Sequence, residues 1–416
     1  MTIDRSLRMT ACLVVLCLTS GQPTRLSAAA VDPITEWGMA ASAAAAASGM
    51  APFRTPIALA LLHVAMFDAV SAIEGGRRPD AVGRRMTQPA SAFAAAVEAG
   101  YRVLLIEFPG QATSLQTTYE RLLGAEPDSV NKRRGMAVGA EIAADFLARR
   151  ADDKRNDVVP YQPLTGPGAW AATPPGFLPE TTAFLARVTP FTMSTPSQFR
   201  PSGPPSLRSK KWLADYNEVK DLGAKGSSTR TAKQTATAMF WEPLAGTVWV
   251  PTIRRMAREH SLDLAGSARF QAAAFAAFAD SLIACWDAKF HFNFWRPIAA
   301  IRQGDSDDNP GTATDPAWEP LSITPNFPEY PSGHACASAA VAHTIEGFLR
   351  EPVTIPAVNI VSKEERVYTR AADLVDEVIE ARMLLGLHFR SADEDGGEIG
   401  RKIAHQIRRH WLGTSN

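Results

Sequence analysis

Apolar residues recur at helical spacing along most of this chain, with few strand signals between the runs. A helix repeats its apolar face every three to four residues, whereas a half-buried strand alternates, so the spacing favours helices. Helices are predicted at residues 34–48, 55–73, 90–108, 112–123, 128–149, 209–222, 229–240, 250–259, 267–291, 335–348, 362–387 and 394–411. The predicted fold class is therefore all-α, with two stacked four-helix bundles as the expected arrangement.

Two proline-rich segments interrupt the helical pattern. Residues 152–207 are rich in proline and glycine, and residues 309–330 form a second such stretch. Both are predicted to be long, irregular loops. Because loops of this length in compact domains are usually functional or wrap the surface, we expect residues 152–207 to cover the mouth of a pocket and to help select substrate.

The segments define the expected domain organisation. Residues 1–30 are predicted to be a secretory signal peptide, and residues 31–416 a single integrated catalytic domain. Within that domain, an N-terminal bundle at about 31–151 precedes the irregular segment 152–207, and a C-terminal bundle at 208–416 carries the active site.

The first residues have the pattern of an export signal. Arg5 and Arg8 precede an apolar stretch, Met9–Thr19, and small residues that suit cleavage follow, so the mature chain is expected to start near Ala30 or Val31. The predicted location is secreted or periplasmic. Beyond this segment no run of about 18 apolar, uncharged residues is found, so no membrane span is expected.

Composition excludes several classes of protein. Lysine plus arginine equals aspartate plus glutamate at 43 each, and this balance does not indicate a nucleic-acid partner. The chain lacks GxGxxG, P-loop, HExxH and CxxCH patterns, which argues against nicotinamide, nucleotide, zinc-protease and haem chemistry. Outside the signal segment only Cys285 and Cys336 remain, and two buried free thiols are expected rather than a disulfide framework.

Three short motifs could grip one oxyanion, and the first is KFHFNFWRP at Lys289–Pro297. Lys289 and Arg296 are seven residues apart, so on a helix both side chains leave from the same face. The aromatic residues between them would keep the site dry, where charges attract anions strongly, and Pro297 would end or bend the helix. The alternative is an amphipathic helix whose Lys and Arg extend to solvent.

The second motif is PSGH at Pro331–His334, just before a small, apolar run. It places Ser332, Gly333 and His334 at a helix N-terminus, where free N–H groups and the helix dipole favour an anion. His334 adds a proton carrier. The alternative is a Ser N-cap beside an incidental histidine.

The third motif is RMLLGLH at Arg382–His388. The two end residues are six apart, which does not align them on a straight helix, but Gly386 could supply the bend that turns both inward. His388 could then coordinate a metal centre or attack phosphorus, and Arg382 adds a cation. The alternative is a core histidine. The other histidines are interpreted as structural: His63, His260, His291, His343, His405 and His410.

The order K-x6-RP, PSGH, R-x5-H resembles the signature shared by vanadium-dependent haloperoxidases and type 2 phosphatidic-acid-phosphatase acid phosphatases. The resemblance covers roughly residues 280–408. Members usually carry Ser before the arginine of the third motif, whereas this chain has Ala381, so one small polar contact is missing.

The resemblance implies contacts to the equatorial oxygens of vanadate or phosphate. The residues implied are Lys289, Arg296, Arg382, Ser332 and the Gly333 N–H. His388 would be the direct vanadium ligand, or the nucleophile in a phosphatase, and His334 the acid/base on the opposite, apical side. Lys289 would also polarise bound peroxide. Glu242 is a further candidate, to orient an arginine.

The choice between the two chemistries depends on residues outside the shared motifs. Trp286 and Phe327 resemble aromatic residues on the halide side of chloroperoxidases of this superfamily, although ordinary core packing would also explain them. The chain of 416 residues is also long for a soluble acid phosphatase of the superfamily.

We therefore expect an exported vanadate-dependent haloperoxidase that uses hydrogen peroxide and halide, with a small organic acceptor as a further partner. The first alternative is a secreted acid phosphatase acting through a phosphohistidine at His388. The second is a non-catalytic, exported oxyanion-binding protein.

Overall fold

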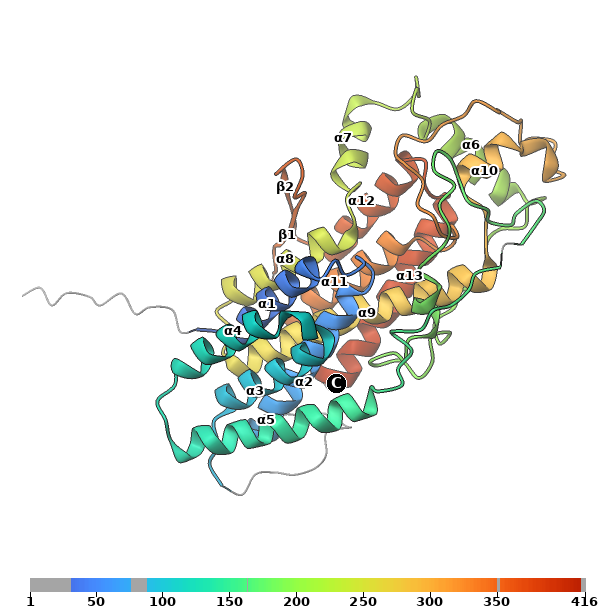
Figure 1. Ribbon diagram of the computed structural model, residues 1–416. Coiled ribbons are helices and arrows are strands. Elements are labelled where there is room, and N and C mark those ends of the chain that lie inside the picture. Colours follow the sequence, from blue (N-terminus) through green and yellow to red (C-terminus); the bar gives the residue numbers. More distant parts are fainter. Residues whose placement is uncertain (1–30, 76–87, 163, 350–351, 413–416) are drawn as a thin grey trace, which may run out of the picture. The chain divides into compact units, whose positions relative to one another are not determined.

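The computed structural model describes residues 31–75, 88–162, 164–349 and 352–412, so the predicted signal peptide lies outside the described residues. These residues are mainly helical (Figure 1), which confirms the predicted fold class. The helices are α1 (Pro33–Ala47), α2 (Thr55–Glu74), α3 (Ala92–Glu107), α4 (Ala112–Gly124), α5 (Val130–Arg149), α6 (Lys210–Leu222), α7 (Ala232–Phe240), α8 (Ala245–Glu259), α9 (Leu264–Phe292), α10 (Pro297–Arg302), α11 (Gly333–Leu349), α12 (Ala371–Leu384) and α13 (Arg390–Ile407).

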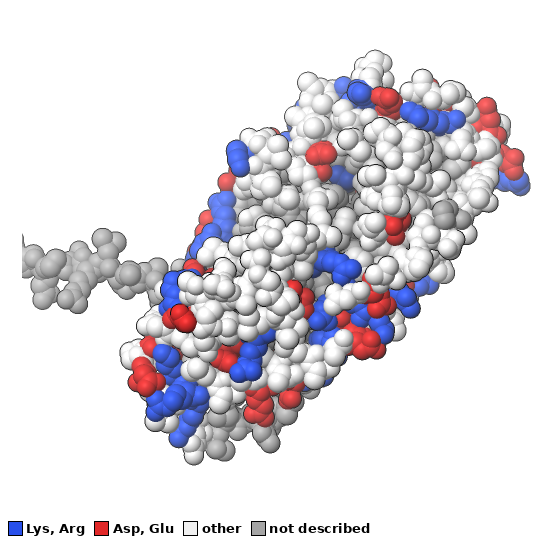
Figure 2. Space-filling view, in the orientation of Figure 1, with Lys and Arg blue, Asp and Glu red and all other residues white. Residues whose placement is uncertain are grey.

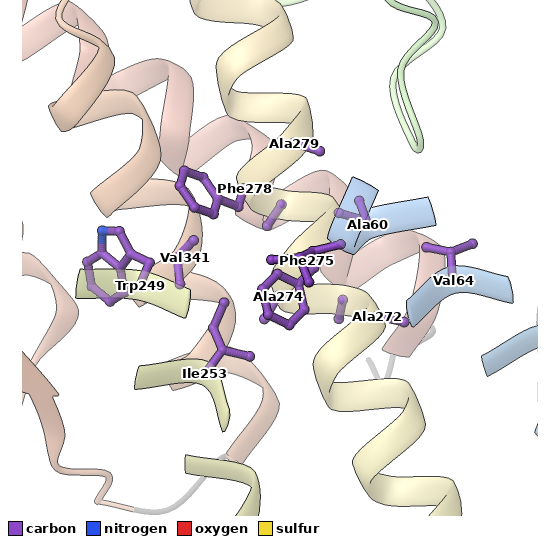
Figure 3. Packing of buried hydrophobic residues seen from close by; sticks show 14 of the residues in the cluster. Ala60, Val64, Trp249, Ile253, Ala272, Ala274, Phe275, Phe278, Ala279 and Val341 are labelled. Carbon is purple, nitrogen blue, oxygen red and sulfur yellow. The ribbon is translucent and has the colours of Figure 1, made fainter. Parts of the chain in front are cut away.

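Helix α9 is the central element of the core. Its 29 residues extend about 44 Å at the helical rise, and they are mostly buried because alanine and phenylalanine occupy all faces rather than one stripe. Asp263 caps its first turn by accepting a hydrogen bond from Gly266 N. Figure 3 shows Phe275 and Phe278 of this helix among side chains from α2, α8 and α11. Burying each such phenylalanine contributes about 1.5–3 kcal/mol.

Helix α2 is also almost wholly apolar. Within the described residues it is the one helix long and apolar enough to cross a membrane by length and composition, but 89% of its most apolar window is buried against the rest of the protein. It packs on α3 and α9. A core helix meets the same criteria, and burial of α2 explains its composition.

Helices α11 and α13 lie in direct backbone contact. A Cβ atom added to Gly396 would come within 2.6 Å of Ser332 O, and one added to Gly400 within 2.4 Å of Cys336 O. Only glycine permits this approach. The close contact fixes the start of α13, which follows His388, beside the start of α11, which carries the PSGH motif.

The region predicted as helix 362–387 is partly wrong. Strands β1 (Ile355–Val358) and β2 (Glu365–Tyr368) form an antiparallel hairpin, and α12 begins only at Ala371. The side chain of Asn359 accepts hydrogen bonds from Val361 N and Ser362 N, which stabilises the turn before β2. Local turn chemistry thus competes with the helical spacing seen in the sequence.

The irregular segment 152–207 is confirmed as largely without regular structure, apart from one 3-10 turn at Ala183–Arg187. It pairs with the connection between α9 and α10, where Trp170 N donates to Asn293 O at 2.9 Å and Trp295 N donates to Gly168 O at 2.9 Å. The division of residues 31–416 into bundles remains a prediction.

Candidate active site

The second and third motifs line one cavity of about 790 Å³, and Arg296 of the first motif contacts His388, with Arg296 Nη1 3.3 Å from His388 Nε2. Its lining includes Gly333 and His334 from the second motif and Arg382 and His388 from the third. Among histidines of the described chain, only these two line the cavity, in agreement with the structural interpretation of the others. No described residue of segment 152–207 lines the cavity, but Thr182 and Pro179 accept hydrogen bonds from the lining residues Trp286 and Asn326, so its role at the pocket mouth stays a prediction.

The first motif reaches the site by a route that differs from the prediction. Helix α9 ends at Phe292 because Asn293 adopts a left-handed conformation with φ 48°, and Arg296 is the N-cap of α10. Pro297 therefore starts a new helix rather than bending the old one. Lys289 and Arg296 do not share a helix face, and a turn in the chain directs Arg296 inward.

Lys289 supports the loop that precedes the PSGH helix. Its fully buried ammonium donates to the carbonyl oxygens of Pro328, Glu329 and Pro331 at 2.9, 2.8 and 2.5 Å. Burial, with a smaller effect from the charge of Arg296, lowers the pKa of Lys289 to about 8. Lys289 is not among the residues that line the cavity. Its ammonium instead holds the backbone of the loop before α11 in place.

Each of the two arginines has a guanidinium nitrogen with no hydrogen-bond partner among the described residues. Arg296 donates from Nε to Phe327 O at 3.0 Å and from Nη1 to Leu387 O at 2.9 Å, and Arg382 donates from Nη1 to Trp241 O at 3.1 Å. Arg296 Nη2 and Arg382 Nε are buried and have no partner among the described atoms. Burial lowers the pKa of Arg296 to about 9 and the pKa of Arg382 to about 10.

Contacts on both ring nitrogens define the tautomer of His388. Its Nδ1 lies 2.8 Å from Glu329 Oε1, and its Nε2 lies 3.3 Å from Arg296 Nη1. Because a guanidinium only donates, Nε2 must accept, so Nδ1 carries the hydrogen and donates to the carboxyl group. Burial, and the charges of the surrounding cations, lower the pKa of His388. The ring is therefore neutral, with the lone pair on Nε2.

Glu329 was missed by the sequence analysis. Its Oε1 also accepts from Phe389 N at 3.1 Å, and its side chain is fully buried. Burial raises the pKa of Glu329 to about 8, while Arg296 and Lys289 lower it. The available signal was a lone acidic residue in the otherwise uncharged stretch FPEYP just before the second motif.

His334 stands at the first turn of α11, as predicted, with Nε2 3.1 Å from Pro243 O. A carbonyl oxygen only accepts, so Nε2 carries the hydrogen and Nδ1 keeps a lone pair. Burial lowers the pKa of His334 well below its usual value, and the charge of Arg382 adds to this effect. His334 is therefore neutral near neutral pH, with its lone pair on Nδ1.

Asp393 is a second acid beside the site. It lies in the first turn of α13 and is fully buried. Burial raises the pKa of Asp393 to about 8, against the opposing effects of the nearby Ser332 hydroxyl and the charge of Arg382. Glu242, the acid predicted to orient an arginine, accepts from Ser322 Oγ at 2.9 Å, and its charge raises the pKa of Arg382.

Comparison with known proteins agrees with this geometry. Residues 269–413 match the family described as the VCPO second helical-bundle domain. A vanadium chloroperoxidase from Curvularia inaequalis is 28% identical over 252 residues, in a match that covers 48% of this chain. This chain covers only 41% of that protein's length.

Residues 269–413 thus form a domain of the VCPO second helical-bundle type.

Solved structures of the family share the fold. A bacterial vanadium-dependent iodoperoxidase superposes with a TM-score of 0.75 at 21% identity, covering 92% of this chain and 98% of that one. A bacterial vanadium-dependent chloroperoxidase in its holo form superposes with a TM-score of 0.63 at 17% identity, covering 92% and 93%.

Aromatic side chains form one wall of the cavity. Trp286 and Phe327, both predicted to lie near it, line the cavity with their ring centroids 5.1 Å apart. Phe53 packs on both, at 4.9 Å from Trp286 and 5.5 Å from Phe327. Phe53 comes from the N-terminal half, and nothing in the sequence indicated its position.

Phe327 also covers buried cations. Its ring centroid lies 5.3 Å from Lys289 Nζ and 5.0 Å from Arg296 Cζ, distances at which a ring face attracts a cation. Phe327, which lines the cavity, thus connects its wall to both cations. Cys285 and Cys336 are free and buried, as expected, and Cys285 Sγ donates to Pro331 O at 3.5 Å.

Proposed function

We propose that this chain is a vanadate-dependent haloperoxidase, which oxidises halide with hydrogen peroxide to hypohalous acid. The main support is the environment of His388, whose neutral Nε2 faces the cavity beside two guanidinium donors that lack partners. A neutral imidazole lone pair is the donor that a metal centre needs. Free guanidinium donors suit the oxygens that surround it.

The donor set fits an oxyanion better than a bare metal cation. Within the described part of the chain, no group of three or more His, Cys, Asp or Glu side chains is placed to hold a metal ion. Instead the cations Lys289, Arg296 and Arg382 surround a single imidazole ligand. Vanadate, which is anionic and needs one imidazole, matches this set, with His388 as ligand and the cations around its oxygens.

Each residue then has a defined task. The chemistry that vanadate supplies when bound is Lewis-acid activation of hydrogen peroxide toward halide. His334 accepts a proton from hydrogen peroxide at Nδ1, since Nε2 is committed to Pro243 O. Arg296 and Arg382 hold developing negative charge on the oxygens, and the wall of Trp286 and Phe327 restricts water on the halide side.

We further propose that the protein acts outside the cytoplasm. The support is the pattern of Arg5, Arg8 and the apolar stretch that follows, which is typical of an export signal. Hydrogen peroxide, halide and a small organic acceptor are the proposed partners. Secretion is tested by the start of the mature chain, expected near Ala30 or Val31.

Two assays on the same purified protein test the activity. After incubation with orthovanadate, the protein should halogenate a dye with hydrogen peroxide and iodide, bromide or chloride, and it should not hydrolyse p-nitrophenyl phosphate. Hydrolysis that vanadate inhibits, without halogenation, would instead establish the acid phosphatase. Inactivity in both assays would leave an oxyanion-binding protein.

A further inference from the structure

The cavity above the oxyanion site is much larger than the proposed small substrates require. Its volume of about 790 Å³ compares with roughly 30 Å³ for a water molecule, and it lies in the range of sites for drug-sized ligands. The walls are largely apolar, with Phe53, Phe278, Leu282 and Phe327 among the lining residues. This space suits an organic body with a planar, apolar surface.

One cation lies in this apolar wall with no ion pair to an acidic side chain in the part of the chain that the structure describes. Arg254 of α8 lines the cavity and donates from Nη2 to Gly38 O and Ser42 Oγ, whereas its buried Nε has no partner within the described residues. Burial lowers the pKa of Arg254 to about 10, and the nearby charge of Arg258 acts in the same direction. Among the described residues, no carboxylate contributes to the pKa shift of Arg254.

Arg254 and the oxyanion site occupy different parts of the cavity. Ala245 starts α8 two residues after Pro243, which contacts His334. Nine helical steps from Ala245 to Arg254 correspond to about 14 Å along the helix. The separation suits a two-ring molecule that places its anionic group on Arg254 and its ring near the reaction site.

We propose that the cavity binds an aromatic organic anion through Arg254 and presents its ring for halogenation. This inference rests on the proposed haloperoxidase activity. Hypohalous acid formed at the oxyanion site transfers halogen to a ring carbon, the displaced hydrogen leaves as a proton, and the remaining hydroxide forms water with it. The cavity then makes the organic acceptor a bound substrate.

The test uses 2-naphthoate as the anionic probe and methyl 2-naphthoate as its neutral counterpart. Calorimetric titration of the full mature chain should show 2-naphthoate binding about tenfold or more tightly than the ester, as one charge-assisted hydrogen bond to a buried guanidinium allows. Arg254→Gln should remove this preference, because the amide can still donate to Gly38 O but carries no charge. Arg254→Lys should restore part of it.

Arg258→Gln is the matched control, since Arg258 lies one turn further along α8 and is exposed. It should bind 2-naphthoate as the wild type does. Equal affinity for acid and ester, or an Arg254→Gln variant that binds like the wild type, would overturn the proposal. Thermal denaturation of each variant confirms that it is folded.

Saturating orthovanadate identifies which cation holds the carboxylate. Binding of 2-naphthoate should change less than about twofold when vanadate is added, because the two anions use different sites. Displacement by vanadate would place the carboxylate on Arg382 and His388, and the proposal would fail. These titrations contain no peroxide or halide, so naphthoate binding without halogenating activity would refute the proposed function and leave the binding site intact.

Discussion

At the scale of single residues, the site combines neutral imidazoles with positively charged side chains. His388 and His334 are neutral because burial and neighbouring cations lower the pKa of each. Each ring donates one hydrogen bond, His388 from Nδ1 to Glu329 and His334 from Nε2 to Pro243 O. The lone pair of each ring therefore lies on the other nitrogen. In the proposed mechanism one imidazole is therefore a ligand and the other a base, although both rings have the same chemistry.

Glu329 should set the vanadate affinity through the tautomer of His388. Glu329→Leu removes the acceptor for His388 Nδ1, and loss of such a partner typically weakens metal binding about 10–100-fold. Glu329→Gln should retain most of the affinity because its amide oxygen can still accept. Calorimetric titration with orthovanadate measures both variants, with Glu319→Gln as an exposed control. A Glu329→Leu variant with wild-type affinity would contradict this role.

Anion binding should weaken as the pH rises through about 8, the pKa to which burial lowers Lys289. The ammonium attracts an anion only when protonated, so its contribution is present below that pH and lost above it. Deprotonation of Glu329, whose pKa burial raises to about 8, adds negative charge in the same range. Sulfate keeps its charge from pH 6 to 9.5, so sulfate titrations report the protein alone. A flat affinity profile across this range would be inconsistent with a buried ammonium at the site.

At the scale of elements, chain turns bring the motifs together. Gly386 adopts φ 74° just after α12, and this bend separates Arg382 on the helix from His388 beyond it. The sequence indicated this bend because only glycine adopts such a conformation without strain. It did not indicate that α9 ends at Asn293, since the helical spacing of the apolar residues continues toward Pro297.

Gly386→Ala should therefore lower the free energy of unfolding by more than backbone strain alone would. A Cβ atom there would lie 2.5 Å from Gly223 O, whereas Gly49, with φ 62°, has nothing within 4 Å of its Cβ position. Gly49→Ala should lower the free energy of unfolding by about 1–2 kcal/mol, and Gly386→Ala by more, about 2–4 kcal/mol. Urea denaturation of both variants measures the difference. Equal losses would show that the contact with Gly223 relaxes freely.

At the scale of the whole molecule, charges of both signs are mixed on the surface, whereas three cations are buried near the site. Lysine and arginine are interspersed with acidic residues on the face shown in Figure 2, in keeping with equal numbers of each sign. The buried cations Lys289, Arg296 and Arg382 come from distant parts of the C-terminal half. The order of their motifs along the chain predicted that these cations lie close together. The supporting acids Glu329 and Asp393 and the aromatic Phe53 required the tertiary contacts.

The most direct test is a crystal structure of the protein soaked in orthovanadate. The account predicts one vanadium atom within bonding distance of His388 Nε2, with its oxygens hydrogen-bonded to Arg296 Nη2 and Arg382 Nε and with His334 on the opposite side. Vanadate bound elsewhere, or a His388 ring that keeps its contact with Arg296 Nη1 at saturating vanadate, would contradict it.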